Sequence, residues 1–263
     1  MPKLCANISM LFNELPFLQR YQAAAVNGFV GIECLFPYEF SIDEVAGAIH
    51  KSGIPQVLIN TSAGDWDAGD RGMACDANRQ EEFQYSVKQA INYAMAMGKP
   101  LVHVMAGLIP NGVSLEHAEE VYVHNLRWAA AQALKSGIRL TMEAINPVDM
   151  PHYILPNQAQ ALRLLKIINA DNVGLQFDFF HCQKHEGNAL EQFKELFPHI
   201  FHVQIAGVPE RNEPNTGVLD YGPVFAVIDA SAYSGYVGCE YRPKSTTVEG
   251  LSWMASVATK FSS

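Results

Sequence analysis

The segment Leu-Val-His-Val-Met at residues 101–105 is a short, almost continuous apolar run. A strand buried on both faces of a parallel sheet has this composition, because both faces pack against apolar neighbours. Similar runs recur along the chain at intervals filled by longer amphipathic segments. The eight predicted strands are Lys3–Ser9, Phe29–Glu33, Ile54–Asn60, Leu101–Met105, Ile138–Glu143, Val173–Asp178, Phe201–Ile205 and Tyr236–Tyr241.

A helical segment follows each predicted strand. Ser41-x-x-Glu44 is a capping box that begins one of them, and that helix is expected to stop at Gly53. The other predicted helices are Pro16–Asn27, Asn78–Met97, Ser114–Ser136, Asn157–Ala170, Asn188–Phe197, Gly222–Ala232 and Thr246–Phe261. Eight alternating β and α units predict an α/β fold, a (β/α)8 TIM barrel, as a single domain over residues 1–263. A doubly wound open sheet is the alternative, but the first strand has no G-x-G-x-x-G after it.

Three connections are longer than a barrel requires: Thr61–Ala77, Phe179–Gly187 and Ala206–Tyr221, all expected to be loops. Loops that follow the strands of a barrel lie over its C-terminal face, where chemistry takes place. We therefore expect these segments to cover an active site. Within the first of them, Trp66, Asp67 and Arg71 are candidates for closing it.

The composition limits the partners of the chain. Its 263 residues are 49% hydrophobic and 17% charged, with a formal net charge of −9, so nucleic acid and anionic membranes are unfavourable partners. No apolar run approaches 18 residues, and no N-terminal signal sequence is evident. The five cysteines are scattered, odd in number and without a C-x-x-C, which is typical of a reducing compartment. We expect a cytoplasmic protein with no membrane contact; whether it forms a homo-oligomer is left open.

Polar side chains end four consecutive strands. They are Glu143, Asp178, Gln204 and Glu240, each after an apolar run. Adjacent strand ends converge in a barrel, so their oxygens can face one point. Isolated carboxylates in apolar surroundings are costly, and a divalent cation would compensate them. Oxygen ligands favour Mg²⁺ or Mn²⁺. The alternative is that each acid only caps the following loop or helix.

Further candidates lie just beyond these strands. His181, three residues after Asp178, is expected to bind a substrate oxygen, and Arg211 to bind a substrate carboxylate. Lys244 and Arg242, after the last strand, are weaker candidates for the same task. His103, inside a strand, is expected to be a hydrogen-bonded core residue.

These motifs resemble the hydroxypyruvate isomerase family within the xylose-isomerase-like TIM barrels, along the whole chain. The matching segments are Ala-Asn-Ile-Ser-Met-Leu-Phe at residues 6–12, Phe-Pro-Tyr at 36–38, Ala-Gly-Asp-Trp-Asp-Ala-Gly-Asp-Arg-Gly at 63–72, Asp-Phe-Phe-His at 178–181 and Gly-Cys-Glu-Tyr at 238–241. The segments at residues 103–107 and 202–211 look closest to the 2-oxo-tetronate isomerase branch. Tyr-Arg-Pro at residues 241–243 departs from the Tyr-Lys-Pro expected, which affects substrate contacts.

The resemblance implies metal ligands at Glu143, Asp178, Gln204 and Glu240, with Glu143 and Glu240 as the acid/base pair. The expected reaction interconverts a small hydroxy-keto acid through an ene-diolate, with 2-oxo-tetronate or hydroxypyruvate as substrate. Three rivals are a ketose epimerase on the same barrel, an abasic-site endonuclease, and a sugar-acid binding protein without activity. The net charge and Gln204 disfavour the endonuclease, and the glutamate pair disfavours a pure binder.

Overall fold

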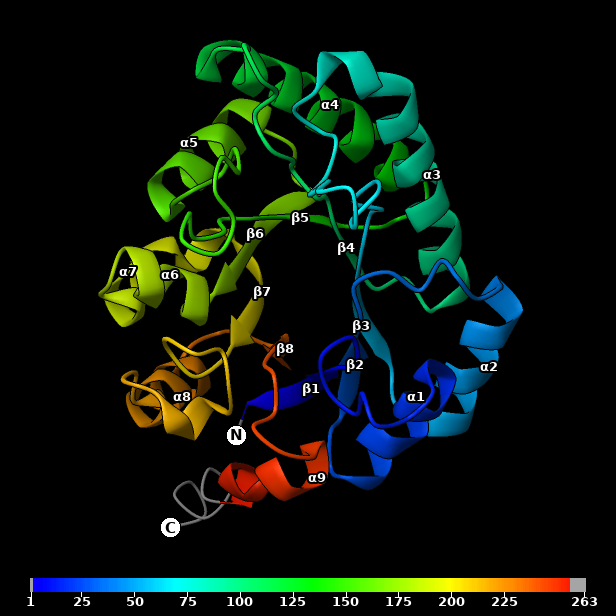
Figure 1. Cartoon of the computed structure of the whole chain (residues 1–263), viewed down its shortest axis with the longest axis vertical. Coiled ribbons are helices and arrows are strands. Elements are labelled where there is room, and N and C mark those ends of the chain that lie inside the picture. The colour runs from blue at the N-terminus through cyan, green and yellow to red at the C-terminus, as the bar shows by residue number, and fades with distance from the viewer. Residues whose placement is uncertain (1, 256–263) are drawn as a thin grey trace.

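The computed structural model describes residues 2–255 and contains a closed barrel of eight parallel strands in sequence order (Figure 1). The strand β8 pairs with β1, for example Cys5 with Gly238, and this pairing closes the barrel. The strands are β1 Lys3–Asn7, β2 Gly31–Glu33, β3 Gln56–Asn60, β4 Leu101–His103, β5 Leu140–Glu143, β6 Val173–Asp178, β7 Ile200–Ile205 and β8 Tyr236–Cys239. The predicted (β/α)8 fold and its eight strands are confirmed.

Helices form a ring outside the strands, as Figure 1 shows. The α-helices are α1 Phe17–Val26, α2 Ile42–Ser52, α3 Gln80–Ala96, α4 Leu115–Lys135, α5 Gln158–Ile168, α6 Phe179–His185, α7 Ala189–Leu196, α8 Tyr221–Ala230 and α9 Thr247–Gly250. Short 3-10 helices are η1 Ala77–Arg79, η2 Phe197–His199 and η3 Pro214–Thr216. The capping box of Ser41 and Glu44 is present, and Gly53 ends α2 in the left-handed conformation. Beyond residue 255, the predicted helix Thr246–Phe261 lies outside the described residues.

The expectation of a loop over Phe179–Gly187 is wrong, because α6 begins directly after β6. Asp178 is its N-cap: one carboxylate oxygen accepts a hydrogen bond from the Phe180 backbone at 2.7 Å. A seven-residue helix is too short to give a clear helical period. The consequence is that residues 179–185 are held rigidly against the end of the barrel.

Alternate residues of the strands face opposite environments. On β6 and β7, Phe177 and Val203 join the main apolar cluster, where the Phe177 ring packs at 5.7 Å from Phe193 of α7. Their neighbours along the two strands, Gln176 and Gln204, point to the other face and hydrogen-bond to each other at 2.8 Å. Apolar packing therefore joins the sheet to the helices, while polar side chains occupy the barrel interior near the carboxyl ends of the strands.

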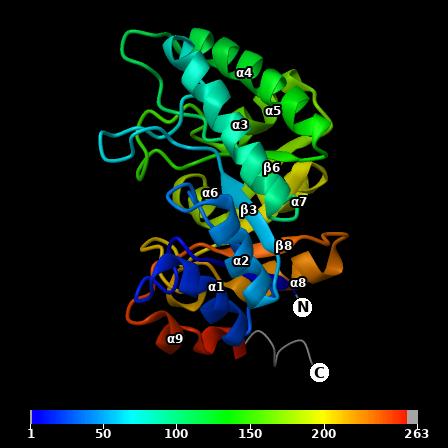
Figure 2. The same cartoon turned by 90° about the vertical axis from the view of Figure 1, so that its right-hand side faces the viewer.

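Long connections gather at one end of the barrel. In Figure 2, the cyan segment after β3 and the green segments beside it project from the same side of the barrel, at the left of the view. The segment after β3 is tied to the segment after β4, since Gly72 forms a bridge with Ala106. Within residues 2–255, no helix has the length and apolar character needed to cross a bilayer.

Candidate active site

A cavity of about 660 Å³ opens at the carboxyl ends of the strands. We call it the active-site cavity. Its walls come from strand ends and from the connections after β1 to β8. The polar residues that line it are Asn60, Arg71, His103, Glu143, Asp149, Gln176, His181, Lys184, Glu210, Arg211, Glu240 and Arg242.

Glu143, at the end of β5, is 4% exposed. Its Oε2 accepts a hydrogen bond from Gln176 Nε2 at 3.1 Å and lies 3.7 Å from His103 Nδ1. Its Oε1 is buried without a hydrogen-bond partner among the described residues. Burial, and then the negative charge of Glu240, raise the pKa of Glu143 well above its ordinary value. This carboxylate is thus poised to accept a ligand or a proton.

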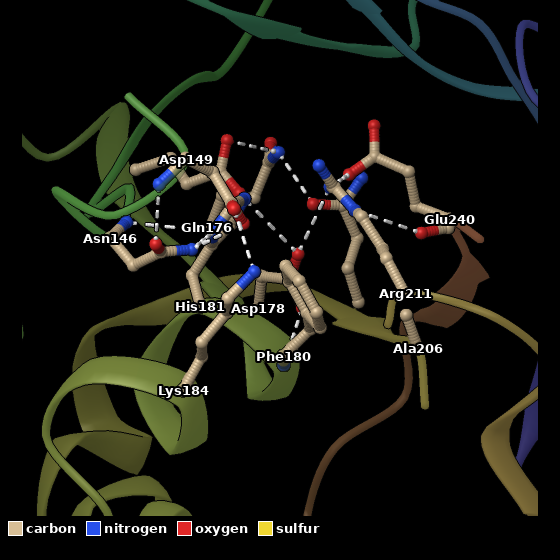
Figure 3. Close-up of polar contacts among 12 residues, drawn as sticks. Asn146, Asp149, Gln176, Asp178, Phe180, His181, Lys184, Ala206, Arg211 and Glu240 are labelled. Atoms are coloured by element: carbon tan, nitrogen blue, oxygen red, sulfur yellow. Dashed lines mark hydrogen bonds and ion pairs between the residues drawn. The ribbon is translucent and has the colours of Figure 1, made fainter. Parts of the chain in front are cut away.

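Arg211 reaches from the β7–α8 connection between two carboxylates (Figure 3). Its Nη2 lies 2.6 Å from Glu240 Oε2 and 3.4 Å from Asp178 Oδ2. Burial raises the pKa of Glu240 to about 8 although Arg211 opposes this, and burial likewise raises the pKa of Asp178 to about 6. From its place in the sequence, Arg211 was predicted to bind a substrate carboxylate; in the structure, the guanidinium already contacts two carboxylates of the protein.

Gln204 lies behind the cavity wall and is fully buried. Its Nε2 donates to Glu33 Oε1 at 2.8 Å, and its Oε1 accepts from Gln176 Nε2 at 2.8 Å. Asn7 Nδ2 donates at 3.0 Å both to Glu33 Oε1 and to Glu240 Oε1. The carboxylate of Glu33 therefore orients Gln204 directly and Glu240 through Asn7.

Glu33 is completely buried below the cavity, and His202 Nε2 lies 2.6 Å from its Oε2. Burial alone would raise the pKa of Glu33, but the charge of His202 and the hydrogen bonds to the carboxylate hold it below its ordinary value. Gly238 leaves room for this carboxylate: a Cβ there would lie 2.3 Å from Glu33 Oε2.

Sequence analysis missed Glu33, Asn7 and Gln176. The signal was present, since Asn7 and Glu33 end the first two strands as Glu143 and Asp178 end later ones. The pattern of polar residues at strand ends therefore extends to the first two strands and predicts both residues as part of the site. Gln176 lies two residues before Asp178, so alternation along β6 places it on the same face.

The remaining predicted residues are distributed unequally. His181 lines the cavity, with its Nδ1 2.7 Å from Asn146 Nδ2 and its Nε2 3.6 Å from Asp178 Oδ2 (Figure 3). His103 is buried, as expected of a core residue, but both ring nitrogens lack hydrogen-bond partners among the described residues and it borders the cavity. Lys244 is exposed and is not among the cavity-lining residues; its backbone N–H donates to Glu213.

The residues present fit a divalent cation. One ligand atom each from Glu143, Asp178 and His181 lies within 4.8 Å of the other two, and Glu143 Oε1 has no other partner. Two carboxylates with a nearby amide and a further glutamate form the oxygen-rich donor set that Mg²⁺ and Mn²⁺ prefer. Of the predicted ligands, Gln204 and Glu240 are engaged instead by side chains of the protein.

Known proteins resemble this chain along nearly its whole length. A 2-oxo-tetronate isomerase from Cupriavidus necator is 42% identical over 254 residues, covering 97% of this chain and 98% of that protein. A hydroxypyruvate isomerase from Escherichia coli is also 42% identical, with the same coverage. A solved structure described as AP endonuclease, family 2, from Brucella melitensis is 40% identical with a TM-score of 0.94, covering 97% of this chain and 99% of that chain. The family model for the xylose isomerase-like TIM barrel matches residues 21–257. By fold, by strand-end chemistry and by these matches, the chain belongs to the xylose isomerase-like TIM barrel family.

Proposed function

We propose that this protein is an isomerase that interconverts a small hydroxy-keto acid, with 2-oxo-tetronate as first substrate candidate and hydroxypyruvate as the second. The observation that carries the proposal is the pair of buried glutamates, Glu143 and Glu240, that line one cavity. One relative is named for each of the two activities, and both match this chain at equal identity and coverage. They support the reaction class and are consistent with either substrate.

The reaction moves a carbonyl to the neighbouring hydroxylated carbon. A base removes the proton from that carbon, an ene-diolate forms, and an acid returns a proton to the former carbonyl carbon. Glu143 and Glu240 serve as the two proton carriers, since burial raises the pKa of both and so makes each carboxylate a stronger base. His181, held by Asn146, is placed to donate a hydrogen bond to a substrate oxygen.

Glu143 and Asp178 would hold Mg²⁺ or Mn²⁺, and Gln204 and Glu240 would join them by exchanging their present partners Glu33 and Arg211 for the cation. A bound divalent cation supplies positive charge against the negative charge that develops on the substrate oxygens. In the structure Arg211 contacts Asp178 and Glu240. With the cation bound, its positive charge would still offset part of the negative charge of these two carboxylates.

An abasic-site endonuclease is the competing function, because the Brucella structure carries that description. The charges of this chain oppose it. Its net charge of −9 repels a phosphate backbone, and three glutamates, Glu143, Glu210 and Glu240, line the cavity. An assay for nicking of abasic DNA with Mg²⁺, Mn²⁺ or Zn²⁺ tests this directly; efficient nicking would overturn the isomerase proposal.

We also propose that the enzyme works in the cytoplasm. All five cysteines are buried free thiols, as expected in a reducing compartment.

The proposed function is tested by NMR of the protein in D₂O with 2-oxo-tetronate and, separately, with hydroxypyruvate. We expect a 3-oxo product from the four-carbon acid or tartronate semialdehyde from hydroxypyruvate, with deuterium at the carbon that receives the proton, and loss of product with EDTA. Product that keeps the carbonyl in place but inverts the neighbouring carbon would identify an epimerase. No turnover of either acid would refute both substrates.

Glu240→Gln keeps the size of the side chain and removes its ability to exchange a proton. We expect kcat to fall roughly 100- to 10,000-fold, with the circular dichroism spectrum unchanged. Glu116→Gln, at an exposed position in the first turn of α4, is the matched control. Near-normal turnover by the Glu240 variant would exclude it as a proton carrier.

A further inference from the structure

Four cationic side chains line the active-site cavity, and two of them are already paired with carboxylates of the protein. Arg211 Nη2 lies 2.6 Å from Glu240 Oε2. Lys184 Nζ lies 2.6 Å from Asp149 Oδ1 (Figure 3). A substrate carboxylate would have to compete with these carboxylates for either cation. The other two, Arg71 and Arg242, form no ion pair with a carboxylate in residues 2–255, and Arg242 is exposed.

Arg71 is half-buried, and one edge of its guanidinium is fixed. Its Nη1 donates to the backbone oxygens of Trp66 at 3.0 Å and Asp70 at 2.6 Å. Its Nε and Nη2 have no hydrogen-bond acceptor within the described chain. These two donors form the side of the guanidinium that binds a carboxylate through two parallel hydrogen bonds.

The plane of this guanidinium is also fixed. The central carbon of Arg71 lies 3.8 Å from the centre of the Trp66 ring, which in turn lies 5.9 Å from the Phe36 ring. Phe36, Trp66 and Arg71 all line the active-site cavity. A cation stacked in this way loses little conformational freedom when it binds an anion.

The backbone that carries Arg71 is held on both sides. Asp70 accepts two hydrogen bonds from Arg79, at 2.7 and 2.8 Å. Gly72 packs so closely on the next strand end that a Cβ would lie 2.4 Å from the Met105 carbonyl oxygen. Arg71 is therefore part of a built wall of the cavity, although its loop lies at the rim.

We propose that Arg71 is the residue that binds the substrate carboxylate, through Nε and Nη2, with Trp66 supporting the guanidinium, and that Arg211 instead serves the catalytic carboxylates. This assignment rests on the proposed function, since it requires an acid as substrate. It makes Arg71 the residue that selects a keto acid over a neutral ketose of the same length.

The test compares 2-oxo-tetronate with erythrulose, which differs only by a CH₂OH group in place of the carboxylate. Steady-state kinetics are measured for the wild type, Arg71→Met and Arg71→Lys. Arg163→Met is the matched control, since this arginine of α5 does not line the cavity. We expect Arg71→Met to raise KM for the acid roughly 30-fold or more, with a smaller change in kcat. Arg71→Lys should recover part of the affinity, and the preference for the acid over erythrulose should fall with Arg71→Met.

Wild-type turnover separates the two ideas. If the wild type converts neither acid, the proposed function fails. If the wild type is active and folded Arg71→Met keeps its KM for the acid, the assignment to Arg71 is wrong. An equally large KM increase in Arg242→Met, with none in Arg71→Met, would move the carboxylate site to the β8 end of the cavity and overturn the proposal.

Discussion

The Glu33 carboxylate accepts hydrogen bonds from Cys5 and Asn7 of β1, contacts His202 at 2.6 Å and accepts from Gln204 of β7. One side chain of β2 thus joins three strands, with no water-exposed surface of its own. A carboxylate surrounded by several donors has no neutral substitute. The N–H groups of a glutamine amide would face other donors at positions where a lone pair is needed. Its effect on catalysis is indirect, because Asn7 and Gln204, which it contacts, hydrogen-bond in turn to Glu240 and Gln176 of the cavity wall.

We predict that Glu33→Gln lowers the free energy of unfolding by about 3 kcal/mol or more, because buried donors lose their acceptor. Urea denaturation measures the change. Gly238→Ala should destabilise the protein through the same group, since the added Cβ would overlap the Glu33 carboxylate. Glu81→Gln, exposed on α3, serves as control. If both Glu33→Gln and Glu81→Gln unfold at the wild-type urea concentration, the network around Glu33 contributes nothing to stability.

Among the elements, the connection between β3 and η1 depends on the ion pair of Asp70 with Arg79. The hydrogen bonds from Arg79 hold the pKa of Asp70 below its ordinary value, although burial opposes them. A depressed pKa in the folded state means that the stabilisation is complete above the unfolded pKa of about 3.9 and is lost as pH falls through the lower folded value.

Asp70→Asn should therefore lower the free energy of unfolding by about 1–2 kcal/mol at pH 7, and the difference from the wild type should shrink below about pH 4. Urea denaturation at both pH values provides the comparison. Asp67→Asn, in the same connection and without an ion pair in the described part of the chain, should change little at either pH. A difference for Asp70→Asn that does not depend on pH would show that shape, and not charge, holds this connection.

The helices and strands also show which parts of the fold could be predicted from the sequence. The strand Val173–Asp178 was predicted to the residue, and the other strands to within about two residues at each end, because burial on both faces leaves a continuous apolar run. The helix α6 was missed because seven residues carry too little periodicity. Glu143 and Glu240 could be predicted as site residues from their places at strand ends. The contact of Arg211 with Glu240 could not be predicted, since it depends on the conformation of a loop.

For the whole molecule, a cation bound by Glu143 of β5 and Asp178 of β6 should link the two strands and increase the stability of the folded state. A ligand that binds only the folded state stabilises it by about 2.7 kcal/mol at 100 times its Kd, which corresponds to roughly 5–10 °C in Tm for a chain of this size. We predict such an increase with Mn²⁺ or Mg²⁺. Asp178→Asn should abolish it while preserving the cap of α6, because asparagine caps helices as well as aspartate. An equal rise in Tm for this variant would rule out Asp178 as a ligand.

The hydrogen bond from Asn7 to Glu240 joins positions 233 residues apart. The N-terminus is synthesised first, so Asn7 of β1 meets its partner only after residue 240 has been synthesised. A nascent chain that has not yet exposed residues 236–240 lacks the strand that closes the barrel and also Glu240, the proposed proton carrier and the partner of Arg211. Translation products that end before residue 236 therefore lack both the closed barrel and this wall of the cavity, so we expect them to be inactive.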